Sequence, residues 1–350
     1  MKRHGFLYHK VWDLDNIREA HKNARKRKTH YREVQMVDAN PEFYFKQIQE
    51  MLRDKTYKTS EYTIFKKIDK GKDREIFKLP YFPDRIVHHC IMQVVEPIWM
   101  KVFIRDTYAS MKDRGIHDGV KRIQKKLKDY PEETQYALQV DVRKFYPSIH
   151  HITLKQIIRK KIKDPDLLWL MDEIIDSNKR GVPIGNYLSQ YFGNLYLNEV
   201  DHWLKEEMGC KHYFRYCDDL VILHSDKAFL HQLRGELESK LAEVRLRLKP
   251  NWRVYPVKTG VDFLGYVFFH NYTLFRTSLA KRFRERMSTV RRHWHRMDAV
   301  SAYSIIMSYY GWQKYANAWN LFTTHLSPEL RQRMSWKTTD VTNPLKGLYT

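Results

Sequence analysis

Three aspartates in two separate segments are the residues whose types and spacing most clearly predict chemistry. Asp218 and Asp219 are adjacent within the largely apolar and aromatic stretch 213–223. Apolar β-formers on both sides of a polar pair predict a strand, a tight turn and a second strand. Asp141 lies in the alternating run 138–142, which predicts another strand.

Adjacent carboxylates repel each other unless a cation lies between them. A short acidic turn taken alone is most often a solvated turn, but the second acidic strand favours a metal site. If the strand of Asp141 pairs beside the hairpin, the three carboxylates converge and present the oxygen ligands that Mg²⁺ prefers. Two such ions, about 3.5–4 Å apart, clamp the attacking and leaving oxygens of an in-line displacement. One ion would activate a primer 3′-hydroxyl, and the other would neutralise charge on departing pyrophosphate.

The composition predicts a polyanionic partner. The chain has 350 residues, with 63 Lys and Arg against 41 Asp and Glu, a net charge of +22 and a pI near 9.7. Nucleic acid is the favoured partner and a membrane surface is the rival. No apolar run approaches the roughly 20 residues that span a bilayer, so we expect no membrane partner. The three scattered cysteines and the N-terminus without an apolar signal core predict a reduced, cytoplasmic protein.

Several other elements are predicted by the spacing of apolar residues. Residues 62–65 and 74–79 form a predicted strand pair, and Asp84 is expected to cap the helix that follows. Residues 186–206 predict a long helix, and 261–269 a single apolar strand. Beyond residue 278, a helical stripe is flanked by arginines; its apolar members are Leu279, Phe283, Met287, Val290 and Trp294.

Two motifs carry a resemblance to a known family. The run Asp141-Val-Arg-Lys-Phe-Tyr-Pro-Ser-Ile149 resembles the first metal-binding motif of reverse transcriptases, and Tyr216-Cys-Asp-Asp219 resembles their Y-x-D-D hairpin. The resemblance covers roughly residues 60–320. It implies an α+β, right-hand polymerase fold with fingers, a palm of antiparallel sheet plus helices, and a helical thumb.

The resemblance also implies boundaries for these parts. We expect a basic helical extension over residues 1–55, and fingers over 56–137 with a contribution from 150–184. The palm is expected over 138–277, and the thumb with a C-terminal tail over 278–350. The basic extension is a candidate for contact with RNA or a protein partner.

The family's roles can be transferred residue by residue. Asp141, Asp218, Asp219 and the Val142 carbonyl would bind two Mg²⁺ ions. Tyr146 would be the aromatic gate under the deoxyribose, and Arg74, with Lys72 or Lys78, would bind the dNTP triphosphate. Phe263, Leu264 and Gly265 would form the primer grip. The residue that would protonate pyrophosphate stays open between Lys249 and Arg253, because both follow the hairpin.

One departure from the general pattern narrows the resemblance. Where most reverse transcriptases have Q-G-x-x-x-S-P, this chain has Ile184-Gly-Asn-Tyr-Leu-Ser-Gln190, so Ile184, Gly185 and Gln190 belong to the expected nucleotide site. This version, and the segment Ser308-Tyr-Tyr-Gly-Trp312, resemble bacterial and phage reverse transcriptases of diversity-generating retroelements. That group copies a template-repeat RNA with errors at adenines, and its partners are that RNA, the RNA/DNA heteroduplex and a small oligomeric accessory variability protein.

Three alternatives remain at this level. The chain could instead be a retron or a group II intron-type reverse transcriptase, although the Ile-Gly-x-x-x-Ser-Gln pattern argues against both. The third alternative is a non-catalytic RNA-binding scaffold with the same fold. Intact Asp141, Asp218 and Asp219 disfavour it, since like charges are costly to keep together without a metal.

Overall fold

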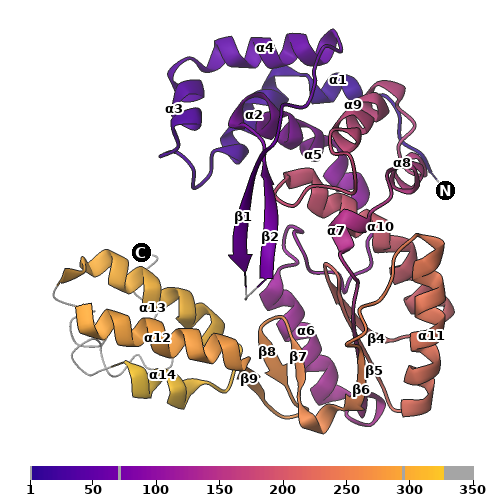
Figure 1. Ribbon diagram of the computed structural model, residues 1–350, viewed down its shortest axis with the longest axis vertical. Coiled ribbons are helices and arrows are strands. Elements are labelled where there is room, and N and C mark those ends of the chain that lie inside the picture. The colour runs from indigo at the N-terminus through magenta and orange to yellow at the C-terminus, as the bar shows by residue number, and fades with distance from the viewer. Residues whose placement is uncertain (1, 70–71, 294–295, 327–350) are drawn as a thin grey trace. The chain divides into compact units, whose positions relative to one another are not determined.

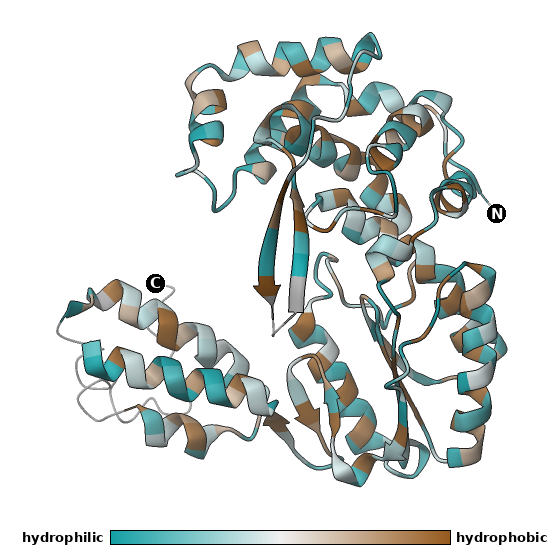
Figure 2. Cartoon of the chain, in the orientation of Figure 1, coloured by the Kyte–Doolittle hydropathy of each residue, from teal (hydrophilic) through white to brown (hydrophobic). Residues whose placement is uncertain are grey.

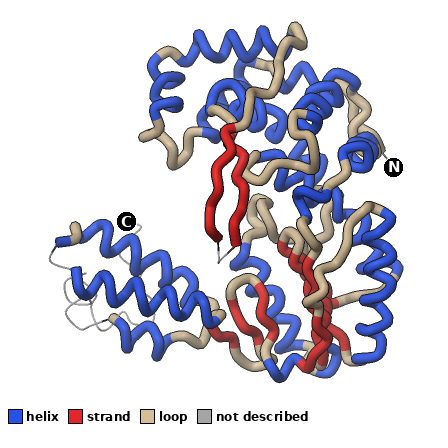
Figure 3. The backbone as a smooth tube through the Cα atoms, viewed as in Figure 1, coloured by secondary structure: helices blue, strands red, loops and turns tan. Residues whose placement is uncertain are grey.

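The computed structural model describes residues 2–69, 72–293 and 296–326. The chain divides into two compact units. The first comprises Met1–Gly115, Leu138–Ile222 and Ala228–Arg253, and the second comprises Ile116–Ala137, Leu223–Lys227 and Val254–Thr350. The strands group into a two-stranded, a four-stranded and a three-stranded sheet, which are drawn in red in Figure 3.

The N-terminal part of the first unit is helical. It contains α1 (Tyr8–Val11), α2 (Leu14–Ala24), α3 (Arg32–Ala39) and α4 (Pro41–Arg53), followed later by α5 (Ile86–Trp99). Asp13 caps α2, since its side chain accepts hydrogen bonds from the backbone N–H groups of Asp15 and Asn16. The apolar face of α2 packs on α5, so this helical layer shares one core.

The predicted strand pair is confirmed as an antiparallel hairpin of β1 (Thr63–Asp69) and β2 (Lys72–Lys78), drawn as two neighbouring arrows in Figure 1. The predicted cap at Asp84 is wrong. Asp84 lies in a π-helical turn (η1, Tyr81–Arg85), and its buried Oδ1 accepts hydrogen bonds from the Tyr57 hydroxyl at 2.8 Å and the Ser60 N–H at 3.1 Å. Its side chain therefore holds the segment before β1 through hydrogen bonds and does not cap the start of α5.

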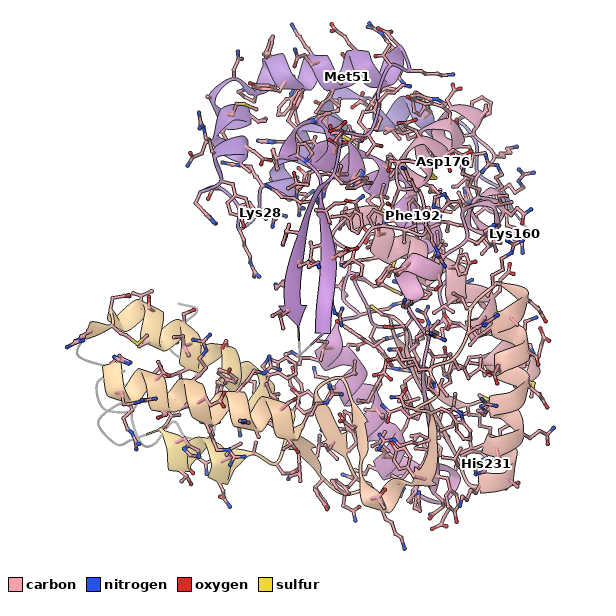
Figure 4. The ribbon with its side chains drawn as sticks, in the orientation of Figure 1. Lys28, Met51, Lys160, Asp176, Phe192 and His231 are labelled. Atoms are coloured by element: carbon pink, nitrogen blue, oxygen red, sulfur yellow. The ribbon has the colours of Figure 1, made fainter. Side chains whose placement is uncertain are left out.

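The four-stranded sheet carries both acidic motifs. Its strand order is β4 (His212–Tyr216), β5 (Asp219–His224), β3 (Tyr136–Asp141) and β6 (Arg253–Pro256). The helices of this region follow in the chain as α7 (Phe145–Ser148), α8 (His151–Arg159), α9 (Pro165–Asp176), α10 (Tyr187–His202) and α11 (Lys227–Glu243). The predicted long helix over 186–206 is confirmed as α10, which a π-helical turn, η3 (Trp203–Glu207), extends. Most side chains of α10 are buried, including Phe192, which is labelled in Figure 4.

The second unit contains α6 (Ile116–Asp129), a three-stranded sheet and a helical end. Residues 261–269 are not the single strand that their apolar composition predicts. They form the hairpin β7 (Val261–Phe263) and β8 (Tyr266–Phe268), which is joined to β9 (Thr273–Phe275). Leu264 and Gly265 take positive φ values of 53° and 89°, as a tight hairpin turn requires. A Cβ at Gly265 would lie 2.7 Å from the Trp312 ring, so only glycine fits there.

Three helices complete this unit: α12 (Thr277–His293), α13 (Ala299–Gln313) and α14 (Trp319–His325). The predicted stripe of Leu279, Phe283, Met287 and Val290 is buried on α12, while Trp294 lies outside the described residues. Hydrophilic residues, among them the exposed arginines, give α12 its teal stretches in Figure 2. The stripe packs against α13 and α14 through side chains that include Ile306 and Phe322.

Candidate active site

The Y-x-D-D segment folds as the sequence predicts, as a hairpin with a two-residue turn. Tyr216 ends β4, Cys217 and Asp218 form the turn, and Asp219 begins β5. Cys217 has a φ of 53°, a left-handed conformation that reverses the chain within two residues. The turn therefore presents Asp218 at the end of the hairpin, while Asp219 belongs to the strand.

Asp141 and Asp218 come from distant segments and meet at this turn. The Val142 N–H donates a hydrogen bond to the Asp218 carbonyl at 3.0 Å, which holds the end of β3 against the hairpin. Burial, and then the negative charge of Asp141, raise the pKa of Asp218 to about 6. Because β3 pairs with β5, the strand end that carries Asp141 lies beside the turn that carries Asp218, as expected if the two strands pair.

Lys249 provides the positive charge beside this acidic pair. Val142 forms an antiparallel bridge with Leu248, and the Lys249 N–H donates to the Asp141 carbonyl at 2.8 Å. Lys249 Nζ lies 2.5 Å from Asp141 Oδ1 as an ion pair, although this buried oxygen has no partner in hydrogen-bond geometry. Arg253, the other cation that the sequence left open, donates instead to the Gln139 side chain at 3.2 Å.

The acidic pair fits a divalent cation. In the described part of the chain, Lys249 is the one cation beside the two carboxylates, so net negative charge remains in this partly buried place. Burial also removes Asp218 from the water that would stabilise its charged form. Oxygen ligands of this kind suit Mg²⁺. Among the described residues, no group of three or more His, Cys, Asp or Glu side chains is placed to hold a metal. The structure therefore brings Asp141 and Asp218 together, while the ligand roles of Asp219 and the Val142 carbonyl stay predictions.

A fully buried ion pair holds the hairpin of β4 and β5 against α10. Arg215 of β4 and Asp201 of α10 are both 0% exposed and make two hydrogen bonds, Nε to Oδ1 at 2.7 Å and Nη2 to Oδ2 at 2.6 Å. Arg215 Nη1 also donates to the Cys217 carbonyl in the turn and to Asn194 Oδ1, each at 3.1 Å. The sequence motifs do not include this support; its signal in the sequence is an arginine among the aromatic residues of 213–216.

Tyr146 lies on α7, beside the turn. Its hydroxyl donates to Cys217 Sγ at 3.7 Å, and burial raises its pKa well above the usual range. Gly193 of α10 lies under this ring and that of Phe145, where a Cβ would approach Tyr146 Cε1 to 3.2 Å. The ring is therefore held by a close helix contact next to the acidic pair, and its role as a sugar gate stays a prediction.

The Ile184 segment packs against the β1–β2 hairpin through its backbone. The Phe77 N–H donates to the Ile184 carbonyl at 2.9 Å, and a Cβ on Gly185, whose φ is 119°, would lie 2.6 Å from the Phe77 carbonyl oxygen. Ile184 is half-buried, whereas Gln190 is exposed in the first turn of α10. The segment thus connects β2 to the helix that carries Asp201.

The three cations predicted to bind triphosphate all lie on β2. Arg74 is exposed and stands opposite Lys67 in the hairpin. Lys78 forms an ion pair with Glu33, with Nζ 3.0 Å from Oε1, so it is already engaged. Lys72 begins the strand, and its side chain is not among those described.

The expected primer grip belongs to the second unit. Phe263 is buried at the end of β7, and Leu264 and Gly265 form the turn to β8. Asp262 forms an ion pair with Arg276, with Oδ1 2.5 Å from Nε. The burial of Phe263 and this ion pair hold the hairpin in place, and contact with a primer stays a prediction.

Comparisons with known proteins show the family to which the chain belongs. Residues 42–268 match the family model described as reverse transcriptase (RNA-dependent DNA polymerase), which is more than half of the chain. The chain belongs to the reverse transcriptase family. The match includes β1 and β2, both acidic motifs and the hairpin of β7 and β8.

Two curated relatives are similar to this reverse transcriptase. Protein YkfC of Escherichia coli (strain K12) is 25% identical over 233 residues, which covers 54% of this chain and 61% of that protein. The group II intron-encoded protein LtrA of Lactococcus lactis subsp. cremoris is 25% identical over 225 residues, covering 59% of this chain and 37% of that protein. The matches therefore span less than two thirds of either relative.

The fold also matches a solved polymerase structure. Apo telomerase from Candida tropicalis has a TM-score of 0.50 at 12% identity, over 84% of this chain and 68% of that one. This similarity confirms the predicted α+β polymerase fold, whereas the boundaries drawn for fingers, palm and thumb stay a prediction. Within the described part of the reverse transcriptase, no helix has both the length and the apolar character needed to cross a bilayer.

Proposed function

We propose that this chain is an RNA-directed DNA polymerase that adds deoxynucleotides to a primer by metal-assisted nucleotidyl transfer. The observation that carries the proposal is the meeting of Asp141 and Asp218, from separate motifs, beside Lys249. A structural role alone does not explain a partly buried carboxyl pair with one counter-charge, because such a pair is costly unless a cation neutralises it.

Each residue of the site has a definite task in this proposal. Asp141 and Asp218 would hold Mg²⁺, which supplies charge for the attacking and leaving oxygens of the displacement. Lys249, which pairs with Asp141, would stabilise or protonate pyrophosphate. Tyr146 would lie under the sugar and disfavour a 2′-hydroxyl. Arg74 would contact the triphosphate, for which a guanidinium is well suited.

The test is primer extension on an RNA template with the variant Asp218→Ala. We expect extension to fall by about a hundredfold or more, since the variant removes a group that stabilises transition-state charge. Asp172→Ala, which changes a partly exposed acid of α9 that is paired with Arg159, is the matched control and should extend normally. Extension that survives Asp218→Ala would leave the non-catalytic RNA-binding scaffold as the better interpretation.

We further propose that the polymerase is of the diversity-generating type. The support is the Ile184-Gly-Asn-Tyr-Leu-Ser-Gln190 segment, which packs on β2 and leads into α10. Its template would be a template-repeat RNA, held as an RNA/DNA heteroduplex during copying, and its partner a small oligomeric accessory variability protein. Sequencing of cDNA made on a template-repeat RNA should show substitutions concentrated opposite adenine.

The similarity to LtrA favours one alternative, an intron-type reverse transcriptase. The same cDNA experiment separates the two: an even, low error rate across the four template bases would favour the intron type over the diversity-generating type.

A further inference from the structure

A second feature of the first unit, outside the acidic pair, is a concave pocket of about 690 Å³. Its walls come from the residues after β3, the short helix α7, the start of α8, the loop near residue 180 and the segment 245–247. Six exposed cationic side chains line it: Arg143, Lys144, Lys179, Arg180, Arg245 and Arg247. No acidic residue is among its lining residues.

In the part of the chain that the structure describes, these cations differ from others nearby in having no carboxylate partner. Within the described residues, none of the six forms an ion pair with an acid. On the adjacent helix α8, by contrast, Lys155 pairs with Asp176 at 2.5 Å and Arg159 with Asp172 at 2.6 Å (Asp176 is labelled in Figure 4). One lining residue, His151, does contact a carboxylate: its Nδ1 lies 3.4 Å from Asp176 Oδ1. The pocket therefore concentrates uncompensated positive charge.

Two of the arginines lie opposite each other in the backbone pairing. Val142 and Leu248 form an antiparallel bridge, and the Arg143 N–H donates to the Arg247 carbonyl at 2.8 Å, so these two residues stand opposite one another. Like charges directly opposite in a ladder are destabilising unless an anion lies between them. Asp141 and Lys249 are the next pair on the same face, about 7 Å along the strands at about 3.4 Å per residue. The pocket thus begins next to the proposed catalytic acids.

The wall of the pocket is held in an unusual backbone conformation. Lys144 and Arg245 both have positive φ values, 46° and 59°, which non-glycine residues seldom adopt. At Gly181 a Cβ would lie 2.4 Å from the Tyr146 carbonyl oxygen, so the loop packs directly behind the proposed sugar gate. Arg245 donates to His150 Nε2 at 2.9 Å, which orients its guanidinium. Such strained positions are kept where the surrounding structure specifies them, most often at functional sites.

We propose that this pocket binds the polyphosphate of the polymerase reaction, as released pyrophosphate or as the triphosphate of a nucleotide on its way to the acids. The proposal rests on the proposed function and adds a second phosphate site to Arg74 of β2. A small anion is favoured over an RNA backbone because the cations surround a concavity of small-ligand size that begins beside the acidic pair. Clustered guanidinium groups are well matched to phosphate oxygens.

The experiment is a binding titration without turnover. The full chain is titrated calorimetrically in metal-free buffer with inorganic pyrophosphate, with dATP and with a single-stranded oligouridylate RNA. We expect the double variant Arg143→Gln/Arg247→Gln to bind pyrophosphate about tenfold or more weakly, since it removes charge-assisted contacts. Lys155→Gln/Arg159→Gln removes the same charge from ion-paired positions outside the pocket and should bind pyrophosphate like the unaltered chain.

The dATP titration distinguishes the two sources of polyphosphate. An equal loss for dATP and pyrophosphate assigns the pocket to incoming nucleotide as well, whereas a loss for pyrophosphate alone assigns it to the leaving product. If the Arg143/Arg247 variant misfolds, Lys179→Gln/Arg180→Gln, which changes only the exposed loop, makes the same test.

Three results would overturn the proposal. They are no pyrophosphate binding by the unaltered chain at millimolar concentration, unchanged binding in the pocket variants, or weakened RNA binding with pyrophosphate binding intact. The last result would make the pocket a nucleic-acid surface. Because these titrations need no catalysis, their failure is separate from the result of the Asp218→Ala extension test.

Discussion

At the scale of single residues, Arg215 connects the acidic hairpin to the helical layer. Its guanidinium is fully buried, with two hydrogen bonds to Asp201 and one to the Cys217 carbonyl in the turn. A charge in this place is stable only while its partner is present. The position of Asp218 therefore depends on a residue of α10 that takes no part in the proposed chemistry.

Replacing Asp201 with asparagine tests this dependence. We expect Asp201→Asn to lower the free energy of unfolding by about 3–5 kcal/mol, because it leaves Arg215 buried without its counter-charge. Asp172→Asn, which breaks the partly exposed pair with Arg159, should cost under about 1 kcal/mol. Urea denaturation of the two variants measures the difference, and equal costs would show that the buried pair does not stabilise the fold.

Ile184 is the residue for which the proposed low fidelity makes a direct prediction. An aliphatic side chain cannot form the hydrogen bond that a glutamine could offer near the incoming nucleotide. Loss of one or two such contacts shifts discrimination by about 1–3 kcal/mol, or roughly ten- to hundredfold. We expect Ile184→Gln to lower misincorporation opposite adenine, as measured by cDNA sequencing, with Met36→Gln on α3, an exposed apolar residue outside the site, as the control. An unchanged adenine error rate would contradict this explanation.

At the scale of elements, α5 carries two buried histidines that make the fold sensitive to acid. His88 is 2% exposed and His89 is 9% exposed and stacked on Tyr187 with ring centroids 4.3 Å apart. Burial lowers the pKa of His88 to about 3 and that of His89 to about 4. Both imidazoles are therefore neutral in the folded chain at pH values where the unfolded chain protonates them.

The sign of the resulting pH dependence follows directly. Between pH 6.5, the ordinary histidine value, and about pH 4, the unfolded state binds more protons, so stability falls as the pH falls. Each histidine contributes up to about 1.4 kcal/mol per pH unit. We expect His88→Leu to reduce the loss of unfolding free energy between pH 7 and pH 5, measured by urea denaturation. Parallel curves for the variant and the unaltered chain would contradict this prediction.

At the scale of the whole molecule, the net charge of +22 is the feature that favours binding of a polyanion. Ion pairs on the helices of the first unit neutralise part of the positive charge. Among the described residues, the arginines and lysines of the pocket near α7 form no ion pair with an acid. Binding of a polyanion by exposed cations releases counterions and weakens steeply as salt rises.

Salt dependence of RNA binding tests this charge-driven recognition. We expect the affinity for a structured RNA to fall at least about tenfold between 50 and 200 mM salt, because several phosphates are neutralised at once. Fluorescence anisotropy at a series of salt concentrations measures the slope. Asp218→Asn removes no cation and should show the same slope, whereas a flat profile would mean that recognition does not depend on phosphate contacts.

The sequence by itself determined the hairpin around Asp218, the strand that ends at Asp141, the long helix α10 and the buried stripe of α12. These follow from local periodicity and turn chemistry, which act over a few residues. It also contained the motifs of the reverse transcriptase family. The same local reasoning was wrong at residues 261–269, where an apolar run conceals a turn whose glycine is required by the distant Trp312 ring.

Only the tertiary structure decided which side chains meet. It placed Lys249 and not Arg253 at Asp141, buried Arg215 against Asp201 and gathered six cations from separate segments around one pocket. Such pairings are set by the way strands and helices pack across long stretches of chain, and no spacing along the sequence encodes them. The acids were therefore predictable as residues, whereas their counter-charges and supports were decided by packing.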